Sequence, residues 1–358
     1  MSDMLITMFV SAYNEEQNIN GILECIKIQD FDQYIMEVVL VDGASTDNTR
    51  ALMCEFALDN KDEFRRVVVL DNPKKTLPSG WNVALREYKG DAIIKVDAHA
   101  VIPEDFVSKN VRVLETGEYI CGGQRPNIID KPTPFKETLL LAESSMFGSS
   151  IASYRNNPGK TYVKSLFHAA YRREVFEKVG FFNEELVRTE DNEIHYRMRK
   201  AGYKLCFDPD IISYQYTRSS LKAMLKQKYA NGYWIGKPRK VCPKCLSIYH
   251  FVPFAFVSAI IASGSVIGAT GLAECIKKRH NHSLGKGISA LRKVTVVLTT
   301  VMWVLYALMA SGMAAVSAFK AEDKRNITNA CLPVLFLLLH LSYGIGTIAG
   351  LMDKSKRG

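Results

Sequence analysis

The stretch EVVLVDGASTD, residues 37–47, decides the fold of this chain. Its first part predicts a short buried strand, because an uninterrupted run of aliphatic residues follows Glu37. The polar residues that come next stop the strand, and Thr46 or Asp47 can cap a following helix that runs to about Leu58. A buried strand, a polar loop and a helix in this order form the repeating unit of a parallel α/β sheet.

The same unit recurs within the first hundred residues. Further strands are expected at residues 5–10, 66–70 and 92–96, and further helices at 18–28 and 79–88. Each strand is a continuous aliphatic run, which is typical of a sheet covered by helices on both faces. Ligands of such sheets bind at the carboxyl ends of the strands, where Asn14, Asp42 and Asp97 are expected.

The pattern changes between residues 117 and 209. Short strands expected at 119–122, 162–167 and 204–207 alternate with helices at 173–179 and 191–200. We interpret this part as the acceptor-facing half of the same domain, so that one α/β domain covers residues 1–221.

The net charge of +9 is unevenly distributed along the 358 residues. Residues 1–221 carry 27 basic and 33 acidic side chains, residues 222–245 carry seven basic and no acidic ones, and residues 246–358 carry twelve basic and four acidic ones. A basic segment that begins where the chain turns hydrophobic favours membrane lipids as the partner. The acidic first part and the lack of a basic-aromatic or zinc-finger motif argue against nucleic acid.

Three stretches without any charged residue follow, at about residues 246–273, 294–319 and 326–352. Each is long enough to cross a hydrocarbon core of about 30 Å. The first contains Pro253 and three glycines, and could be a span or a bent, re-entrant element. Three simple crossings would place the basic loop after it outside, against the positive-inside rule, so we prefer the re-entrant topology.

The start of the chain lacks a basic segment followed by an apolar core, so no signal peptide is expected. Together with the hydrophobic stretches, this predicts a multi-pass protein of the plasma (inner) membrane with a cytoplasmic first domain. The eight cysteines include one close pair, Cys242 and Cys245, and a single such pair favours free thiols over a zinc site.

Three acidic elements are candidate site residues. Asp42, at a strand tip, could accept hydrogen bonds from a nucleobase or a ribose, or could satisfy loop amides instead. Asp97 and His99 point the same way if the segment is extended, and could converge on Mg²⁺ or Mn²⁺. Glu190 and Asp191 lie at a helix start, where they could supply a catalytic base or simply suit the helix dipole.

Six motifs carry a specific resemblance by their order and spacing. They are VSAYNEEQNI (10–19), VDGASTDNT (41–49), NPKKTLPSGWNVAL (72–85), KVDAHA (95–100), YRREVFEKVGFFNEEL (171–186) and TEDNEIHYRMRKAGYK (189–204). Over about residues 4–240 the chain resembles family 2 glycosyltransferases, in particular bacterial membrane-associated enzymes of the succinoglycan type that build exopolysaccharide. The resemblance implies a GT-A fold, with a nucleotide-sugar-binding half joined to an acceptor half, followed by transmembrane helices.

The resemblance also implies roles for individual residues. Asp42 matches the acid that contacts the nucleobase, and Asp97 matches the first acid of the D-x-D element, with His99 at its last position. Asp191 matches the base that deprotonates the acceptor hydroxyl in an inverting, in-line displacement, with Glu190 beside it. The other residues expected to contact the nucleotide-sugar are Ser11, Tyr13, Glu15 and Lys75.

The chain departs from the family pattern in three places. The usual D-D-G-S reads DGAS at residues 42–45, which removes one carboxylate, and His99 replaces an acid of the metal element. The Gln-x-x-Arg-Trp element of long-chain synthases is absent, which disfavours repeated addition. Gln227 and Trp234, seven apart, could still line the acceptor entrance, or Trp234 could be a juxtamembrane anchor.

The sequence therefore predicts an inverting, metal-dependent glycosyltransferase. It would move one sugar from a nucleotide-sugar, expected to be UDP-linked, to a lipid-linked saccharide at the cytoplasmic membrane face. The expected cofactor is a divalent metal, Mg²⁺ or Mn²⁺. The alternatives are a polyprenyl-phosphate sugar transferase and a non-catalytic membrane protein that retains the fold. A dinucleotide-binding oxidoreductase fits poorly, because no GxGxxG follows the first strand.

Overall fold

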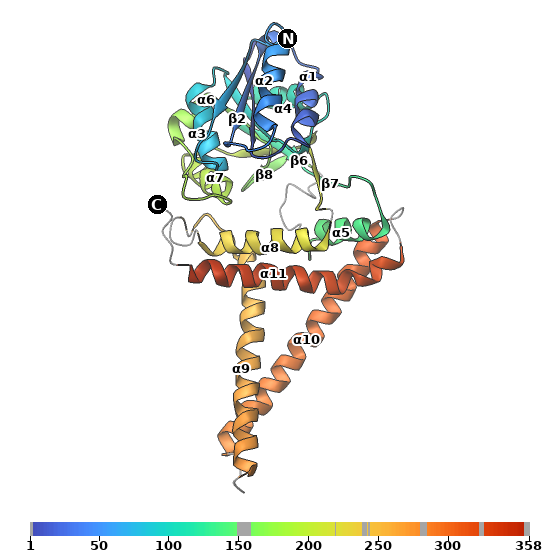
Figure 1. The fold of residues 1–358 in the computed structure, drawn as a ribbon. Coiled ribbons are helices and arrows are strands. Elements are labelled where there is room, and N and C mark those ends of the chain that lie inside the picture. The colour runs from blue at the N-terminus through green and yellow to red at the C-terminus, as the bar shows by residue number, and fades with distance from the viewer. Residues whose placement is uncertain are drawn as a thin grey trace.

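The computed structural model describes residues 3–148, 159–218, 220–237, 242, 244–279, 285–321 and 326–353. Its α/β domain is built on an eight-stranded sheet of order β3-β2-β1-β4-β9-β6-β10-β8 (Figure 1). The strands are β1 (Ile6–Ala12), β2 (Met36–Asp42), β3 (Arg66–Asp71), β4 (Ala92–Asp97), β6 (Ile120–Gln124), β8 (Thr161–Val163), β9 (Ala170–Arg172) and β10 (Leu205–Ile212).

The four strands β3, β2, β1 and β4 are parallel, as the aliphatic runs predict. The second half is mixed rather than parallel, because β9 inserts antiparallel between β4 and β6, and β8 pairs antiparallel with β10. A smaller sheet of order β5-β11-β7 lies beside it, built from β5 (Ala100–Val101), β7 (Asn127–Ile128) and β11 (Tyr214–Tyr216). The fold is therefore a mixed α/β sheet.

Helices cover both faces of the large sheet. Alternate strand residues contact two separate apolar clusters, for example Met8 one and Phe9 the other. One cluster includes α1 (Ile19–Lys27), α2 (Thr49–Asp59) and α4 (Phe106–Glu115), and the other α3 (Leu77–Glu87), α6 (Arg173–Val179) and α7 (Glu190–Lys200). The predicted cap of α2 is wrong in detail: Asn48 precedes the helix, and Asp47 accepts a hydrogen bond from the Thr49 amide.

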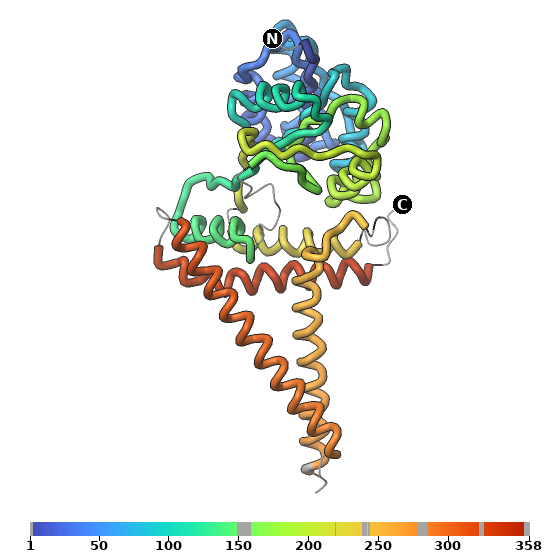
Figure 2. The backbone as a smooth tube through the Cα atoms, turned by 180° about the vertical axis from the view of Figure 1, so that it is seen from behind, coloured from blue at the N-terminus to red at the C-terminus, as the bar shows by residue number. Residues whose placement is uncertain are grey.

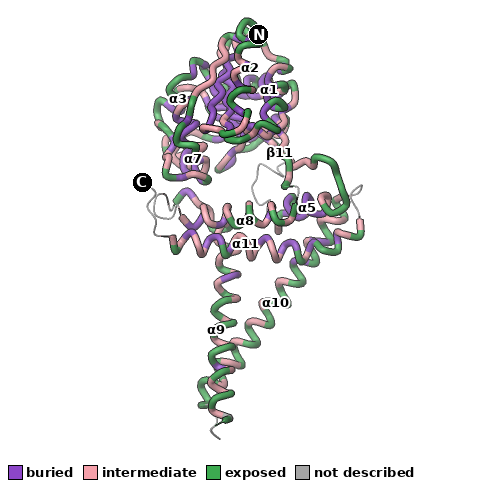
Figure 3. Tube along the Cα trace, viewed as in Figure 1, coloured by how far each residue is buried: buried purple, intermediate pink, exposed green. Residues whose placement is uncertain are grey.

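The remaining helices form a separate arrangement below the sheet. They are α5 (Pro134–Ser144), α8 (Leu221–Gly236), α9 (Val252–Arg279), α10 (Lys286–Lys320) and α11 (Leu332–Met352). Figures 1 and 2 show α8 and α11 side by side across the molecule, while α9 and α10 project together away from the sheet. Three apolar segments, containing α9, α10 and α11, are long enough to cross a membrane. Figure 3 shows that α9 and α10 are mostly exposed, as lipid-facing helices would be.

The bend expected in the first apolar segment is wrong, whereas the path of this segment through the membrane stays a prediction. In the described residues α9 is one continuous helix, because Pro253 occupies its first turn, where a missing backbone N–H costs no hydrogen bond. The end of α9 and the start of α10, which carry basic residues such as Lys277 and Lys286, therefore lie far from the α/β domain (Figure 1). This placement differs from the expectation that the basic loop shares the side of that domain.

The two helices α8 and α11 pack unusually closely, and we call this pair the plate. Each carries two glycines four residues apart, Gly232 and Gly236 on α8 and Gly346 and Gly350 on α11. A Cβ atom on any of these would overlap the backbone of the other helix. Small residues at this spacing allow such an approach, as in membrane helix pairs.

The plate also receives part of the chain from within residues 1–221. Leu139 and Ala142 of α5 are buried against Met224 of α8 and Phe336 of α11. Helix α5 therefore packs with the apolar helices although it precedes them by far in sequence (Figure 1). The division of the chain at residues 221 and 245 remains a proposal, with α5 as an excursion from the α/β domain.

Candidate active site

The candidate residues of the first half lie along the carboxyl edge of the parallel strands. The strand register pairs Ser11 with Asp97 and Ala12 with Asp42. Of the described non-glycine residues, five have left-handed backbone, and four of them flank this edge: Asn14 (φ 55°), Ala44 (φ 56°), Lys75 (φ 62°) and His168 (φ 46°). Such conformations are unfavourable for residues with a Cβ and concentrate at functional sites.

Asp42 lies at the bottom of this edge with 1% of its surface exposed. Its Oδ2 accepts a hydrogen bond of 3.1 Å from the amide of Ser45, whereas its buried Oδ1 has no partner among the described residues. A buried carboxylate oxygen without a donor is costly unless a ligand supplies one. At Gly43 a Cβ would lie 3.1 Å from the carbonyl oxygen of Ala12, so the missing family carboxylate would be crowded there.

Tyr13 and Lys75 lie at the rim of the same edge. The Tyr13 ring is 46% exposed, and the ammonium group of Lys75 lies 5.6 Å from its centroid. Ser11 faces α3 instead, since a Cβ on Gly80 would lie 2.8 Å from the Ser11 hydroxyl oxygen. The structure thus places Tyr13 and Lys75 where a ligand can reach them, and Ser11 beneath the start of a helix.

Asp97, at the end of β4, is held by two residues that sequence reasoning missed. Its carboxylate forms an ion pair with Lys95, and His168 Nε2 lies 3.2 Å from both its Oδ2 and its backbone nitrogen. Burial opposes ionisation of Asp97, but the charge of Lys95 and the His168 contact outweigh it and hold the pKa well below its usual range. Burial lowers the pKa of His168 to about 4, so this imidazole is neutral near pH 7.

His99 does not share an extended segment with Asp97, contrary to expectation. The strand ends at Asp97 and a turn follows, so His99 is directed differently and its Nδ1 lies 3.0 Å from Glu15 Oε1. The two predicted metal ligands therefore lie near one another, but they do not project from the same face of one strand. The charge of His99 still acts on Asp97, which places both at one end of β4.

A divalent metal fits this donor set only with help from a ligand. Within the described residues, no three His, Cys, Asp or Glu side chains are grouped to hold a metal ion. Asp97 and His99 offer one carboxylate and one imidazole, a pair that suits Mn²⁺. The remaining ligands would come from the phosphates of a substrate. The residues thus fit a metal that is bound jointly with a diphosphate.

The acidic pair of the second half lies at the first turn of α7, with Glu190 buried and Asp191 partly buried. Glu190 has 8% of its surface exposed, and its Oε2 is buried with no partner in the described chain. Burial, and for Glu190 also the neighbouring charge of Asp191, raises the pKa of both carboxyl groups. Asp191 accepts a hydrogen bond of 2.7 Å from the amide of Asn192.

Lys95 connects the two acidic elements electrostatically. It lies on β4 with 7% exposed surface, and its charge acts on Asp97 and on both Glu190 and Asp191. Its ammonium group lies 5.2 Å from the centroid of the Phe167 ring, and the guanidinium carbon of Arg125 lies 3.4 Å from the same centroid. The signal for Lys95 was present in the sequence, because it is a charged residue that interrupts the aliphatic run of β4. Arg125 and Phe167 had no such signal.

Helix α8 lies below α7 and carries the predicted entrance residues. Gln227 leaves its buried Oε1 without a partner in the described residues, and Trp234 lies two turns further along the same helix. The Lys237 ammonium group lies 5.5 Å from the Trp234 ring, and Arg188, two residues before Glu190, donates a 3.5 Å hydrogen bond to Asn231 of α8. The plate thus contacts the loop that leads into the acidic pair.

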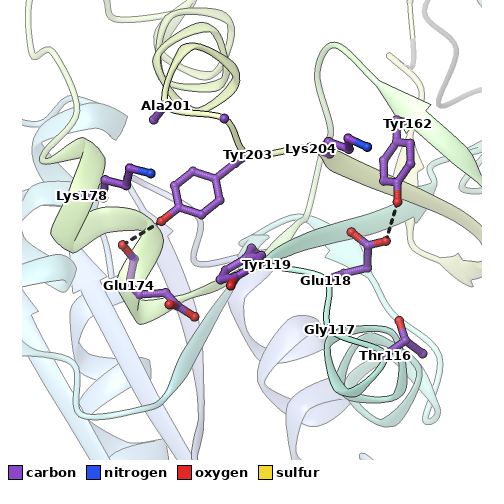
Figure 4. Close-up of a pocket in the computed structure, with 11 residues that line it drawn as sticks. Thr116, Gly117, Glu118, Tyr119, Tyr162, Glu174, Lys178, Ala201, Tyr203 and Lys204 are labelled. Atoms are coloured by element: carbon purple, nitrogen blue, oxygen red, sulfur yellow. Dashed lines mark hydrogen bonds between the residues drawn. The ribbon is translucent and has the colours of Figure 1, made fainter.

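A surface depression lies elsewhere on the molecule (Figure 4). Its volume is about 680 Å³, and it is lined by residues that include Tyr119, Tyr203 and Lys204. Tyr119 and Lys204 precede β6 and β10, so they lie at the amino ends of strands that run parallel to β4. Asp97 lies at the opposite edge of the sheet, and the depression is therefore separate from the candidate site.

The family is decided by a match over the residues that form this edge. Residues 7–180 match the model of the family described as "Glycosyl transferase family 2". This part of the chain belongs to that family. The strand-end residues Asp42 and Asp97 of the glycosyltransferase lie inside the matched region, whereas Glu190 and Asp191 lie just beyond it.

Two curated relatives are similar to this glycosyltransferase. The succinoglycan biosynthesis protein ExoA of Rhizobium meliloti is 28% identical over 228 residues, which are 62% of this chain and 66% of that protein, a little under two thirds of its length. A dolichyl N-acetyl-α-D-glucosaminyl phosphate 3-β-D-2,3-diacetamido-2,3-dideoxy-β-D-glucuronosyltransferase of Methanococcus voltae is 25% identical over 264 residues, covering 72% of this chain and 80% of that protein.

A solved structure shows the same fold along the whole chain. The mannosyltransferase PcManGT from Pyrobaculum calidifontis, in complex with GDP-Man and Mn²⁺, matches with a TM-score of 0.59 at 18% identity. The match covers 99% of this chain and 89% of that one. The α/β domain is thus a GT-A domain followed by apolar helices.

Proposed function

We propose that this glycosyltransferase moves a single sugar from a nucleotide-sugar to a lipid-linked saccharide, with inversion at the anomeric carbon. We take a UDP-sugar as the first donor to test. The reaction would occur at the cytoplasmic face of the plasma (inner) membrane, in the synthesis of an exopolysaccharide or another cell-surface polysaccharide.

One observation carries the proposal. Two acidic elements, the partly buried Asp97 on β4 and the pair of buried Glu190 and partly buried Asp191 on α7, flank the buried ammonium group of Lys95. Buried oxygens of Asp42 and Glu190 have no donor among the described residues. A site with this charge pattern suits a ligand that brings its own hydroxyl groups and a diphosphate.

Different residues along the sheet edge would have different roles in the reaction. Asp42 would accept hydrogen bonds from the nucleobase or ribose, and Tyr13 and Lys75 would line the donor at the rim. Asp191 would take the proton of the acceptor hydroxyl as its oxygen bonds to the anomeric carbon. The bond from that carbon to the diphosphate would break in the same displacement, releasing the nucleoside diphosphate. Burial raises the pKa of Asp191, which makes it a stronger base once it is ionised.

A divalent metal held by Asp97 and His99 would supply charge neutralisation for the diphosphate leaving group. The solved neighbour contains Mn²⁺ with its nucleotide-sugar, which makes Mn²⁺ the first ion to test.

The acceptor is inferred from the membrane helices and the relatives. The name of the Methanococcus relative describes transfer to a sugar on a dolichyl phosphate, and the Rhizobium relative serves succinoglycan synthesis. An acceptor whose lipid stays in the bilayer would be concentrated near an enzyme anchored by α9 and α10. Gln227 on α8 would face this acceptor with its unpartnered oxygen.

A second candidate is transfer to a polyprenyl phosphate itself. Arg188 lies two residues before Glu190, and burial together with the nearby charge of Arg218 lowers its pKa. Two arginines near one another, with no carboxylate ion pair of their own among the described residues, would suit a phosphate. A phosphate acceptor needs no strong base, so full activity of Asp191→Asn would favour this candidate.

The test is nucleotide release from a panel of UDP-, GDP- and dTDP-sugars, using the full chain in detergent with Mn²⁺. Each reaction would be run with and without a bacterial lipid extract, beside Asp191→Asn. Release of one nucleotide that depends on both the extract and Asp191 would support the proposal. A lack of release and of donor binding for every sugar would contradict it.

A further inference from the structure

Lys95 lies between the two acidic elements of the site and has no role in the steps proposed above. It precedes Asp97 by two positions on β4, so both side chains emerge on the same face of the strand. Its ammonium group is in direct contact with the Asp97 carboxylate, the predicted metal ligand. The side chains are 9% and 16% exposed, so solvent screens their attraction only in part.

A cation at Asp97 would have to displace this ammonium group. A carboxylate oxygen that accepts an ammonium hydrogen at close range cannot keep that contact and bind a metal at the same position. Asp97 can offer its other oxygen only beside His168, which lies 3.2 Å away. The free protein therefore presents Asp97 with its charge already compensated.

We propose that the ammonium group of Lys95 and the divalent cation compete for the carboxylate of Asp97, so that the protein without nucleotide binds the cation weakly. This inference rests on the proposed function, because it assumes that Asp97 is a metal ligand. The diphosphate of the donor removes the competition by adding oxygen ligands for the cation.

The surroundings of Lys95 offer its ammonium group a second position. Its charge acts on Glu190 and Asp191 at the start of α7, and the Phe167 ring centroid lies 5.2 Å from its ammonium group. A lysine stem is flexible enough to turn from Asp97 toward these carboxylates without a change of the backbone. Lys95 is thus a positioning residue, and it links occupation of the donor site with the acidic pair that receives the acceptor.

The experiment measures Mn²⁺ binding by electron paramagnetic resonance, which follows the signal of free Mn²⁺. Full-length wild type, Lys95→Met and Asp97→Asn are compared in detergent, without nucleotide and with UDP, GDP or dTDP. Lys178→Met is the matched control, because Lys178 lies 5.1 Å from the Tyr203 ring in the depression at the opposite edge of the sheet. Lys95→Gln is the second variant, in case Lys95→Met does not fold.

We expect Lys95→Met to bind Mn²⁺ about tenfold more tightly than wild type when no nucleotide is present. Wild type should gain affinity on addition of the nucleotide, and Asp97→Asn should lose it in every condition. A gain of affinity separates competition from a merely structural role, since a damaged fold would bind the ion less well.

Two outcomes overturn the inference, and they are distinguishable. If wild type binds Mn²⁺ with nucleotide but both Lys95 variants bind no more tightly than Lys178→Met without it, the competition is absent and the proposed function stands. If no protein binds Mn²⁺ with any nucleotide, the metal-dependent part of the proposed function fails together with it.

Discussion

Asp42 and Asp71 are register partners at the ends of two neighbouring parallel strands, yet their surroundings are opposite. Asp71 is mostly exposed and forms an ion pair of 2.8 Å with Arg50. Asp42 is buried, and one of its oxygens has no donor among the described residues. Their difference makes the pair a natural comparison for donor binding.

Asp42→Asn should weaken binding of the donor nucleotide by about 10- to 100-fold, because an amide replaces one acceptor of the nucleobase or ribose by a donor. Asp71→Asn makes the same chemical change one strand away and should leave donor affinity unchanged. Isothermal titration calorimetry with the nucleotide found by the release assay measures both. Equal affinities for the two variants would remove Asp42 from the donor site.

Asp191→Asn should reduce transfer by about 10²- to 10⁴-fold while donor binding stays nearly intact, because the amide cannot take the acceptor proton. Asp59→Asn, at the exposed end of α2, is the control and should transfer at the wild-type rate. Product formation and calorimetric donor affinity are measured together. A parallel loss of donor binding in Asp191→Asn would argue against its role as the base.

The buried Glu190 should make stability depend on pH. Burial and the neighbouring Asp191 raise the pKa of Glu190, so the folded protein binds a proton that the unfolded chain has already released. The free energy of unfolding should therefore fall as pH rises above the ordinary glutamate range of about 4.3 toward the raised value. Glu190→Gln should flatten this part of the profile.

Thermal unfolding midpoints in detergent, recorded between about pH 5 and pH 8, test this expectation for wild type and Glu190→Gln. Identical slopes for the two proteins would mean that folding does not raise the pKa of Glu190.

Much of the α/β domain could be predicted because its strands are continuous aliphatic runs. The strand expected at residues 66–70 is observed at Arg66–Asp71, and the helix expected at 173–179 is α6. The mixed second half could not be predicted in the same way. Side-chain periodicity gives no direction for a strand as short as β9, which depends on contacts with β4 and β6 that are distant in sequence.

Only those residues of the candidate site that belong to one short sequence motif could be predicted. Asp42 and Asp97 end strands, so the pattern that predicts the strands also predicts their edge. The contact of His168 with Asp97 depends on the antiparallel insertion of β9, and no local pattern reports it. Helix α5 did have a local signal that the sequence reading left unused, because Thr133 caps it and Pro134 follows in the first turn.

The plate provides a test of packing. Gly232→Ala would place a methyl group against the backbone of Tyr343 and should destabilise the protein by about 1–3 kcal/mol. Gly264→Ala, on α9 with nothing within 4 Å of its Cβ position, is the control and should leave stability unchanged or slightly higher. The comparison uses thermal unfolding in detergent, and equal midpoints would show that the two helices separate at little cost.

The close glycine contact of α8 with α11 has a geometric consequence for the acceptor. The glycines leave the backbones of α8 and α11 in close contact, and Arg188, two residues before Glu190, donates a hydrogen bond to Asn231 of α8, so the acidic pair lies beside the apolar helices. We expect the clearance between the acidic pair and these helices to act as a gauge of length. An acceptor would be recognised by how many sugar units separate its reactive hydroxyl from its lipid, independently of the identity of those sugars.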